Sequence, residues 1–211
     1  MQRLVISVTN DLVTDQRVRK VCQSLAAEGF DIVLIGRKLK DSLPVERPYR
    51  TIRMRLLFNK SFWFYAEYNI RLFFLLFFLK KDFLLANDLD TLLPNFLIAK
   101  LFGKKLVYDS HELFTEVPEL TNRPSVRNVW LHIEKSIFPK LKNVITVNQV
   151  IADIYEKKYE VPVLVIRNIA PKLQDVKYNN KLALEVKGNK KMLIYKVRVS
   201  IKIGERRKLF K

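Results

Sequence analysis

Short apolar runs alternate along the chain with longer segments that have the length and spacing of helices. Five apolar runs lie at residues 4–8, 30–35, 83–86, 106–108 and 163–166. Two further strand-like runs, at residues 51–56 and 143–148, contain more polar residues. Uninterrupted apolar runs are typical of strands that are buried on both faces of a parallel sheet. A helix between two such strands can join them as parallel neighbours through a right-handed crossover. The pattern therefore predicts an α/β fold with a Rossmann-like, doubly wound parallel sheet of about seven strands.

Helix boundaries can be placed from capping residues and glycines. Apolar residues recur at helical spacing through residues 18–26, which predicts one stripe that faces the core. Thr14 is the expected N-cap of this helix, and Gly29 is expected to end it with a positive φ angle. Asp90 is the expected N-cap of a later helix, which would place Pro94 in its first turn, where no N–H is needed.

Residues 58–81 combine a strong helical signal with many aromatic and basic side chains. Residues 72–79 are too few to cross a bilayer, which takes ~20 residues, so we expect a buried crossover helix there. From Arg53 to Lys81 there are 10 aromatic and six basic residues against one acid. Such a mixture suits an anionic lipid surface, although core packing also explains it. The residues expected at a membrane surface are Trp63, Phe64, Tyr65, Lys60 and Arg71.

The strand at residues 106–108 is followed at once by polar residues that include His111 and Glu112. Ligands of doubly wound sheets bind beyond the carboxyl ends of the strands, and a His between carboxylates can hold a hydroxyl or move a proton there. The alternative is that Ser110 caps the next helix and His111 is merely exposed. The first strand ends in Asn10 and Asp11 without a glycine-rich turn, which argues against a bound dinucleotide.

The fourth strand ends in Asn87, and Asp88-Leu-Asp90 follows it. An Asp-x-Asp pattern can hold a divalent metal and a nucleotide diphosphate in some transferases. Because helix capping already accounts for Asp90, we expect no metal site here.

Composition narrows the partners and the compartment. The net charge of +18 favours anionic surfaces or phosphorylated substrates, but the basic residues are scattered and form no nucleic-acid motif, so nucleic acid is not the expected partner. Cys22 is the single cysteine, and the first strand begins at Arg3, which leaves no room for a secretory signal. These features predict a cytoplasmic protein, with peripheral attachment to the inner face of the membrane as a further option.

Five stretches together resemble the N-terminal half of GT-B glycosyltransferases of the large retaining group called family 4. They are Ser7-Val-Thr-Asn-Asp-Leu-Val-Thr-Asp-Gln-Arg-Val18, Leu34-Ile-Gly-Arg37, Ala86-Asn-Asp-Leu-Asp-Thr-Leu-Leu-Pro-Asn95, Tyr108-Asp-Ser-His-Glu112 and Ile145-Thr-Val-Asn148. The resemblance implies that this half binds a glycan or lipid-linked acceptor. A second half would bind the nucleotide sugar, and no cofactor or metal would be needed.

The resemblance also assigns roles to individual residues. His111 matches the family's catalytic-site histidine, which lies at the sugar and acceptor in the cleft. Asn10 and Asp11 match the first-strand loop that faces the same cleft. Beside them, the further residues that we expect to bind the acceptor are Asn87, Asp88, Glu112 and Glu116. Arg167 and Asn168 match the hinge that leads to the donor domain.

The chain departs from the family after Tyr195, where a glycine-rich turn is expected and a basic tail stands instead. The expected organisation is an acceptor domain at residues 1–168, a linker at 169–190, and the start of a second domain at 191–211. We expect a frameshift or premature stop to explain the tail, with an evolved basic anchor as the alternative, and we expect the chain to be inactive by itself. The rival functions are a non-enzymatic binder of membranes or nucleic acid, and a metal-dependent GT-A-type transferase that uses Asp88 and Asp90.

Overall fold

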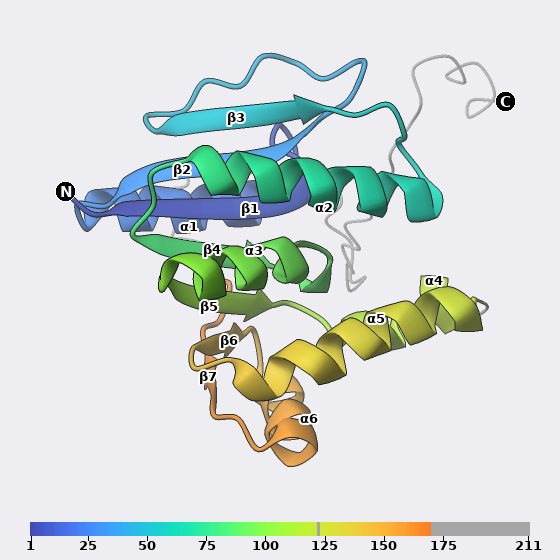
Figure 1. Ribbon diagram of the computed structural model, residues 1–211. Helices are drawn as coiled ribbons and strands as arrows, with labels where there is room; N and C mark the ends of the chain where they lie inside the picture. The colour runs from blue at the N-terminus through green and yellow to red at the C-terminus, as the bar shows by residue number, and fades with distance from the viewer. Residues whose placement is uncertain (122, 170–211) are drawn as a thin grey trace, which may run out of the picture. The chain divides into compact units, whose positions relative to one another are not determined.

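The computed structural model describes residues 1–121 and 123–169, and it confirms the α/β fold. Within this part of the chain, seven strands form one sheet, and every neighbouring pair is parallel. The order across the sheet is β3-β2-β1-β4-β5-β6-β7 (Figure 1). The strands are β1 (Arg3–Asp11), β2 (Asp31–Lys38), β3 (Arg50–Arg55), β4 (Phe83–Asn87), β5 (Lys105–Ser110), β6 (Val144–Thr146) and β7 (Val163–Val165).

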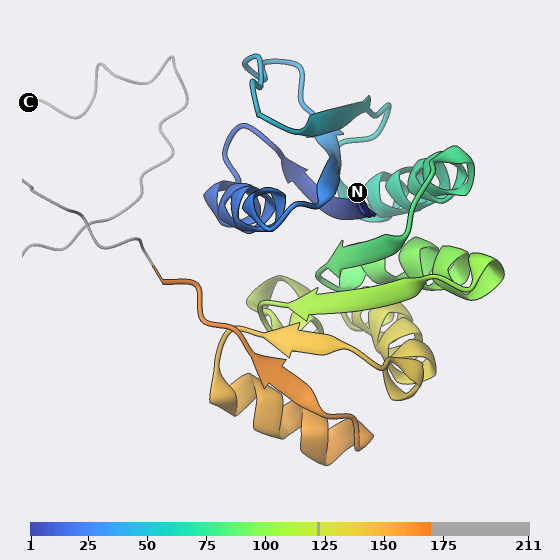
Figure 2. The ribbon, with the colours of Figure 1, turned by 90° about the vertical axis from the view of Figure 1, so that its left-hand side faces the viewer.

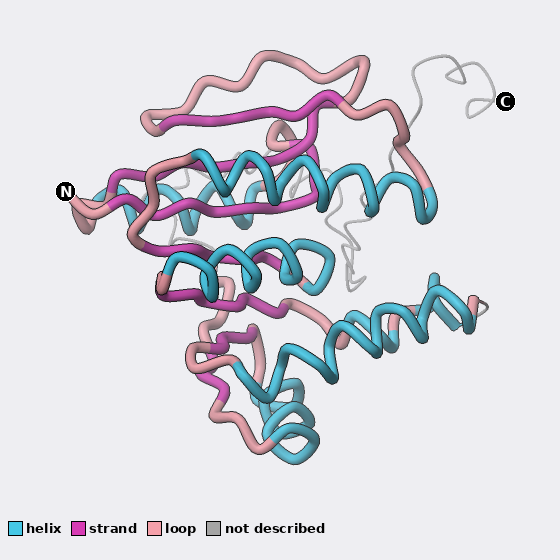
Figure 3. Tube along the Cα trace, viewed as in Figure 1, coloured by secondary structure: helices cyan, strands magenta, loops and turns pink. Residues whose placement is uncertain are grey.

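Helices connect the strands and cover both faces of the sheet. Helix α1 lies on one face, while α2, α3 and α5 lie on the other (Figure 2). The alternation of strand and helix can be followed along the trace in Figure 3. The helices are α1 (Gln16–Ala27), α2 (Ser61–Phe78), α3 (Leu89–Phe102), α4 (Pro118–Thr121), α5 (Pro124–Ile137) and α6 (Gln149–Tyr159), with 3₁₀ turns η1 (Phe114–Glu116) and η2 (Phe138–Lys140).

Two apolar cores form because successive strand residues point to opposite faces. Leu4 and Ile6 pack with Val18 and Cys22 under α1, so the predicted core-facing stripe of α1 is confirmed. Val5 belongs to the larger core on the other face, beneath α2 and α3.

Helix α1 begins one residue later than the sequence suggested. Asp15, not Thr14, is the N-cap, and its Oδ1 accepts a hydrogen bond from the Val18 N–H at 3.0 Å. Gly29 has a φ of 88°, so the prediction for the end of this helix is confirmed.

Helix α3 differs more from the expectation. Asp88 is its N-cap residue, and Asp90 is a buried residue inside the first turn. Pro94 is therefore in the second turn and cannot donate to the Asp90 carbonyl. The side-chain amide of Asn69 on α2 donates to that carbonyl instead, at 2.9 Å. This contact satisfies the carbonyl and ties α2 to α3.

The described residues form a compact unit at Met1–Ile169. Except for Ile169, the linker expected at residues 169–190 lies outside the described residues. So do the expected strand that ends at Tyr195 and the basic tail at 196–211.

Candidate functional site

The strand order reverses between β1 and β4, which is the place where open α/β sheets bind ligands. From β1 the chain moves outward to β2 and β3, and from β4 it moves the other way to β5, β6 and β7. Because β1, β4 and β5 are parallel neighbours, their carboxyl ends bring Asn10, Asp88 and His111 to the same end of the sheet, which is called the carboxyl edge below. The Asp88 N–H donates to the Asp109 carbonyl at 2.9 Å, which joins the ends of β4 and β5.

Both ring nitrogens of His111 face carboxylates. Nδ1 lies 3.2 Å from Oδ1 of Asp88, and Nε2 lies 3.1 Å from Oδ2 of Asp109. The backbone N–H of His111 also donates to Oδ1 of Asp88 at 3.0 Å. The His111 side chain is only 10% exposed. The imidazole is thus fixed in position by two acids rather than merely exposed.

This environment determines the charge of His111. Burial alone would lower the pKa of His111, but hydrogen bonds to Asp109 and Asp88 and their negative charges raise it to about 9. The ring is therefore a cation at neutral pH, and both of its N–H groups are already engaged. Burial would raise the pKa of Asp88, but its bonds and attraction to His111, with the charge of Arg17, lower it.

Asp88 has an unusual backbone conformation as well as a central position. Its φ of 59° lies in the left-handed region, which non-glycine residues rarely adopt. Its Oδ2 lies 3.4 Å from Nη2 of Arg17. Local strain of this kind persists only where surrounding contacts enforce it, and it is common at functional sites. Together Arg17, Asp88, Asp109 and His111 form the His111 cluster. Arg17 is the member that the sequence did not indicate as part of the site, although it stands in the first motif stretch.

Asp90 lies in a different environment from Asp88. Its Oδ2 accepts a hydrogen bond from Thr9 Oγ1 at 2.6 Å, and it is buried. Burial, together with the negative charge of Asp88, raises the pKa of Asp90 to about 7. The two carboxylates of the Asp-x-Asp pattern thus have separate partners. In residues 1–121 and 123–169, no group of three His, Cys, Asp or Glu side chains is placed to hold a metal ion.

The other candidate residues of this edge divide into supporting and accessible side chains. Asp11 is buried, bonds to Ser42, and pairs with Arg53 at 3.0 Å. Burial would raise the pKa of Asp11, but these contacts and a backbone N–H lower it. Asn87 is buried and donates to the Ser7 carbonyl at 3.1 Å.

Asn10 and Glu112 are exposed at the same edge. Glu116 is also exposed and pairs with Arg127 at 2.6 Å. Arg167 and Asn168 are exposed directly after β7. These accessible side chains are the ones that a ligand can reach without a rearrangement of the core.

A glycine makes the approach of β1 to β2 possible at this edge. A Cβ on Gly36 would lie 2.9 Å from the Asn10 carbonyl oxygen and 2.4 Å from the Leu12 side chain. Only glycine therefore fits here without displacing the end of β1. This accounts for the glycine in the Leu34-Ile-Gly-Arg37 stretch.

The residues expected at a membrane do not all lie on the surface. Trp63 is 62% exposed, and Lys60 and Arg71 are also exposed. Phe64, in contrast, is buried in the core beneath the Arg37 guanidinium, so it cannot contact a membrane in this structure. Tyr65 is half-buried and packs edge-on against Trp130 at 5.1 Å.

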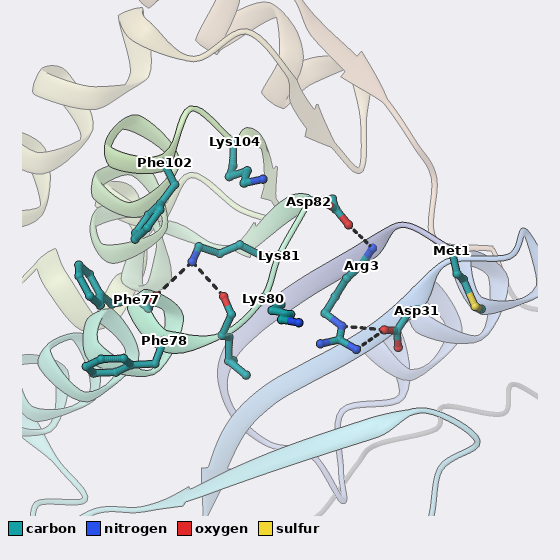
Figure 4. Close-up of a pocket in the computed structure, with 11 residues that line it drawn as sticks. Met1, Arg3, Asp31, Phe77, Phe78, Lys80, Lys81, Asp82, Phe102 and Lys104 are labelled. Carbon is teal, nitrogen blue, oxygen red and sulfur yellow. Dashed lines mark hydrogen bonds and ion pairs between the residues drawn. The ribbon is translucent and has the colours of Figure 1, made fainter.

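A pocket of about 550 Å³ lies at the other end of the strands, near the amino ends of β1, β2 and β4 (Figure 4). Lys81 is buried there, and its Nζ donates to the carbonyls of Phe77 and Leu79 at the end of α2. Cations are favoured at helix C-termini, so Lys81 has a structural role. Arg3 pairs with Asp31 in the same pocket. The pocket lies at the amino ends of β1, β2 and β4, whereas His111 lies beyond the carboxyl ends of the strands, so the pocket does not form part of the His111 site.

Comparison with known proteins agrees with this architecture. Residues 15–170 match the family described as Glycosyltransferase Family 4. Among curated proteins, none matches the chain significantly.

Three solved structures illustrate the likeness. Sucrose-phosphate synthase from Thermosynechococcus elongatus is 18% identical, with a TM-score of 0.61, over 79% of this chain and 48% of that one. Os79 T291V from O. sativa in complex with UDP is 11% identical, with a TM-score of 0.53, over 77% and 51%. UGT2 of Phytolacca americana, complexed with UDP-2fluoro-glucose and pterostilbene, is 12% identical, with a TM-score of 0.54, over 83% and 55%.

At these identities the likeness shows the fold, which is that of one half of a GT-B glycosyltransferase. The chain spans about half of the length of these three structures. The family match covers most of the chain and includes β4, β5 and the His111 cluster. This chain therefore belongs to Glycosyltransferase Family 4.

Proposed function

We propose that this chain supplies the acceptor-side half of an enzyme that transfers a sugar from a nucleotide-sugar donor to a glycan or lipid-linked acceptor. The observation that carries the proposal is the His111 cluster at the switch point of the sheet. Family membership and the UDP-bound neighbours support a nucleotide-sugar donor.

The proposed role of His111 is to hold the loop after β5 in the position that the acceptor requires, rather than to accept a proton. A general base must have a free lone pair, and the pKa of about 9 keeps His111 protonated at neutral pH. Its charge and its bonds to Asp88 and Asp109 hold the loop after β5 in place. Asn10 and Glu112, which are exposed nearby, are the proposed contacts for acceptor hydroxyls.

The remaining candidates have supporting roles in this proposal. Asp11 and Asn87 hold the ends of β1 and β4, since both are buried and already hydrogen-bonded. Glu116 contributes an accessible carboxylate beside Arg127. Arg167 and Asn168 are the proposed hinge after β7.

Substitution of the two histidines tests the proposal in the natural polypeptide that contains these residues. His111→Ala should lower kcat/KM about a hundredfold or more, because loss of one preorganised group has effects of this size. His132→Ala is the matched control, since His132 is exposed on α5 and away from the cluster. Equal activity of the His111 variant and the wild type, at equal folded fraction, would remove His111 from the site.

We further propose that the 211-residue polypeptide, tested by itself, does not turn over a nucleotide sugar. Transfer requires the donor to be held against the acceptor, and residues 170–211 are too few for a second α/β half. A panel of radiolabelled nucleotide sugars tests this directly. Robust transfer by the purified polypeptide would contradict it.

A peripheral position at an anionic membrane is the second part of the proposal. None of the helices in the described residues is long and apolar enough to span a bilayer. The exposed Trp63 lies close to Lys60 in sequence, and the stripe of α2 that carries Trp63 continues through Ile70 and Phe74, which are more than half exposed. Aromatic and basic side chains together favour the interface of an anionic bilayer.

A further inference from the structure

An apolar groove lies between α2, α3 and α5, on the face of the sheet opposite α1. Its volume is about 530 Å³, within the range of small-molecule sites. Six of the side chains that line it are Phe62, Tyr65, Ile70, Leu93, Val129 and Trp130. None of the residues that line the groove is charged.

The rim of the groove exposes apolar side chains to solvent. Phe62 is 54% exposed, Ile70 is 58% exposed, and Val129 is 48% exposed. A smaller apolar hollow of about 280 Å³ shares Asn69, Ile70 and Leu93 with the groove and continues between α2 and α3. Contiguous exposed apolar surface marks interaction sites and ligand-binding grooves.

Rigid contacts keep the groove open. Trp130 packs edge-on against Tyr65 at 5.1 Å and against Phe114 at 5.3 Å. These rings form a wall that cannot collapse into the groove without losing its own packing. On the other side, Asn69 is held by its bonds to the carbonyls of Tyr65 and Asp90.

The same contacts join the groove to the His111 site. Asn69 bonds to Asp90, two residues after Asp88, in the first turn of α3. Phe114 lies three residues after His111 and packs on the Trp130 wall. A molecule in the groove thus lies alongside the segments that position the cluster.

Charges on the three helices select the kind of amphiphile that could bind. The acids of these helices have partners: Glu67 pairs with Arg71, Asp90 bonds with Thr9, and Glu134 pairs with Lys158. Exposed cations, in contrast, stand beside the groove at the N-termini of two of these helices. Lys60 precedes Phe62 by two residues, Arg123 precedes Ser125 by two, and none of the ion pairs among the described residues involves either cation. The face therefore complements an anionic head group.

We propose that this groove binds a single hydrocarbon chain of an acceptor that carries a phosphate head group. The inference rests on the proposed glycosyl transfer and names its acceptor class, an anionic lipid. The apolar lining takes the chain, while the basic surface of the helices takes the phosphate. The reacting sugar or hydroxyl end can then reach the edge at which His111 lies.

A homologous series of monomeric alkyl phosphates tests the proposal on the 211-residue chain. Octyl, decyl and dodecyl phosphate are titrated below their micelle-forming concentrations, with calorimetry and tryptophan fluorescence as readouts. Each added methylene should tighten binding about fourfold if the chain is buried in the groove. Binding that does not depend on chain length would overturn the proposal.

Two polar substitutions at exposed positions provide the comparison. Ile70→Ser alters the groove rim and should reduce the dependence on chain length. Val150→Ser is the control, because Val150 is 68% exposed on α6 and does not line the groove. Both positions are exposed, so thermal unfolding should show that both variants remain folded. An equal effect of the two variants would overturn the proposal.

Two further results would also overturn it. If a second copy of the chain covers the groove, sedimentation will show a dimer, and alkyl phosphate will bind only as the dimer dissociates. If neutral alkyl maltosides bind as tightly as the phosphates, the anionic head group plays no part. The proposed glycosyl transfer is tested separately by the histidine variants with water-soluble acceptors, so failure here leaves that test intact.

Discussion

Replacement of His111 by glutamine gives the sharpest test of the proposed site electrostatics. The folded pKa of about 9, against 6.5 for an unperturbed histidine, corresponds to roughly 3 kcal/mol of unfolding free energy. The side chain is only 10% exposed, so solvent screens this interaction little. His111→Gln should therefore destabilise the protein by about 3 kcal/mol near pH 6, and it leaves Asp88 and Asp109 without a cation between them.

The sign of the pH dependence follows from the raised pKa. The folded protein binds the His111 proton more tightly than the unfolded chain does. This stabilisation is fully present below pH 6.5 and is lost as the pH rises through about 9. At the acid end, the pKa of Asp88 is lowered, so its contribution is lost only as the pH falls below 3.8. The difference in unfolding free energy between wild type and variant should therefore be largest between about pH 3.8 and pH 6.5.

Urea denaturation from pH 6 to pH 10, on wild type and His111→Gln, measures this difference. Asp90 also titrates near neutrality, with a pKa of about 7, to which the charge of Asp88 contributes. Because His111 contacts Asp88, the stability difference is read together with a direct titration of the imidazole. NMR of the imidazole C–H resonances gives the pKa directly, and the sequence has only one other histidine, His132.

Two results would refute this reasoning. A His111 resonance that titrates at or below 6.5 would mean that the two carboxylates do not hold the ring as a cation. A difference in unfolding free energy that stays constant from pH 6 to pH 10 would mean that the proton on His111 makes no contribution to stability.

Three further predictions concern packing and the surface. Gly36→Ala should destabilise the protein by about 1–3 kcal/mol in urea unfolding, because its Cβ would lie 2.9 Å from a backbone oxygen at the end of β1; unchanged stability would contradict this. Asn69→Ala should cost about 1–3 kcal/mol, because the Asp90 carbonyl loses its side-chain donor; restored stability in Asn69→Gln would locate the effect in the amide. Trp63→Ser should weaken co-sedimentation with anionic vesicles at unchanged stability, whereas Phe64→Ser should lower stability by about 3 kcal/mol or more. If neither the Trp63 substitution nor added salt changes vesicle binding, the proposed attachment to anionic membranes is wrong.

The sequence by itself determined the class of the fold, because its strands carry their signal locally. The apolar runs that became β1, β2 and β4 are buried on both faces, and a parallel sheet is the arrangement that buries them in this way. The stripe of α1 was also readable, since polar residues occupy its other side. Gly29 needed no tertiary information, because a helix end at positive φ is a local event.

Only the tertiary structure decided which side of α2 and α3 faces the sheet. Both helices are apolar nearly all round, so their periodicity does not distinguish a buried side from an exposed one. The neighbours Trp63 and Phe64 look alike in sequence, yet one is 62% exposed and the other is buried. The groove and its apolar rim follow from the same packing and could not be foreseen.

The chemistry of the site was also decided in three dimensions. The sequence located His111 and its neighbouring acids, but it could not show that Asp88, 23 positions earlier, shares the imidazole with Asp109. That pairing depends on β4 lying beside β5, and it changes His111 from a free base into a fixed cation. Asp90 shows the converse. Its local sequence resembles an N-cap, but it lies inside the first turn of α3, where burial and the charge of Asp88 raise its pKa to about 7. Spacing along a chain selects candidate groups, whereas burial and distance determine their protonation.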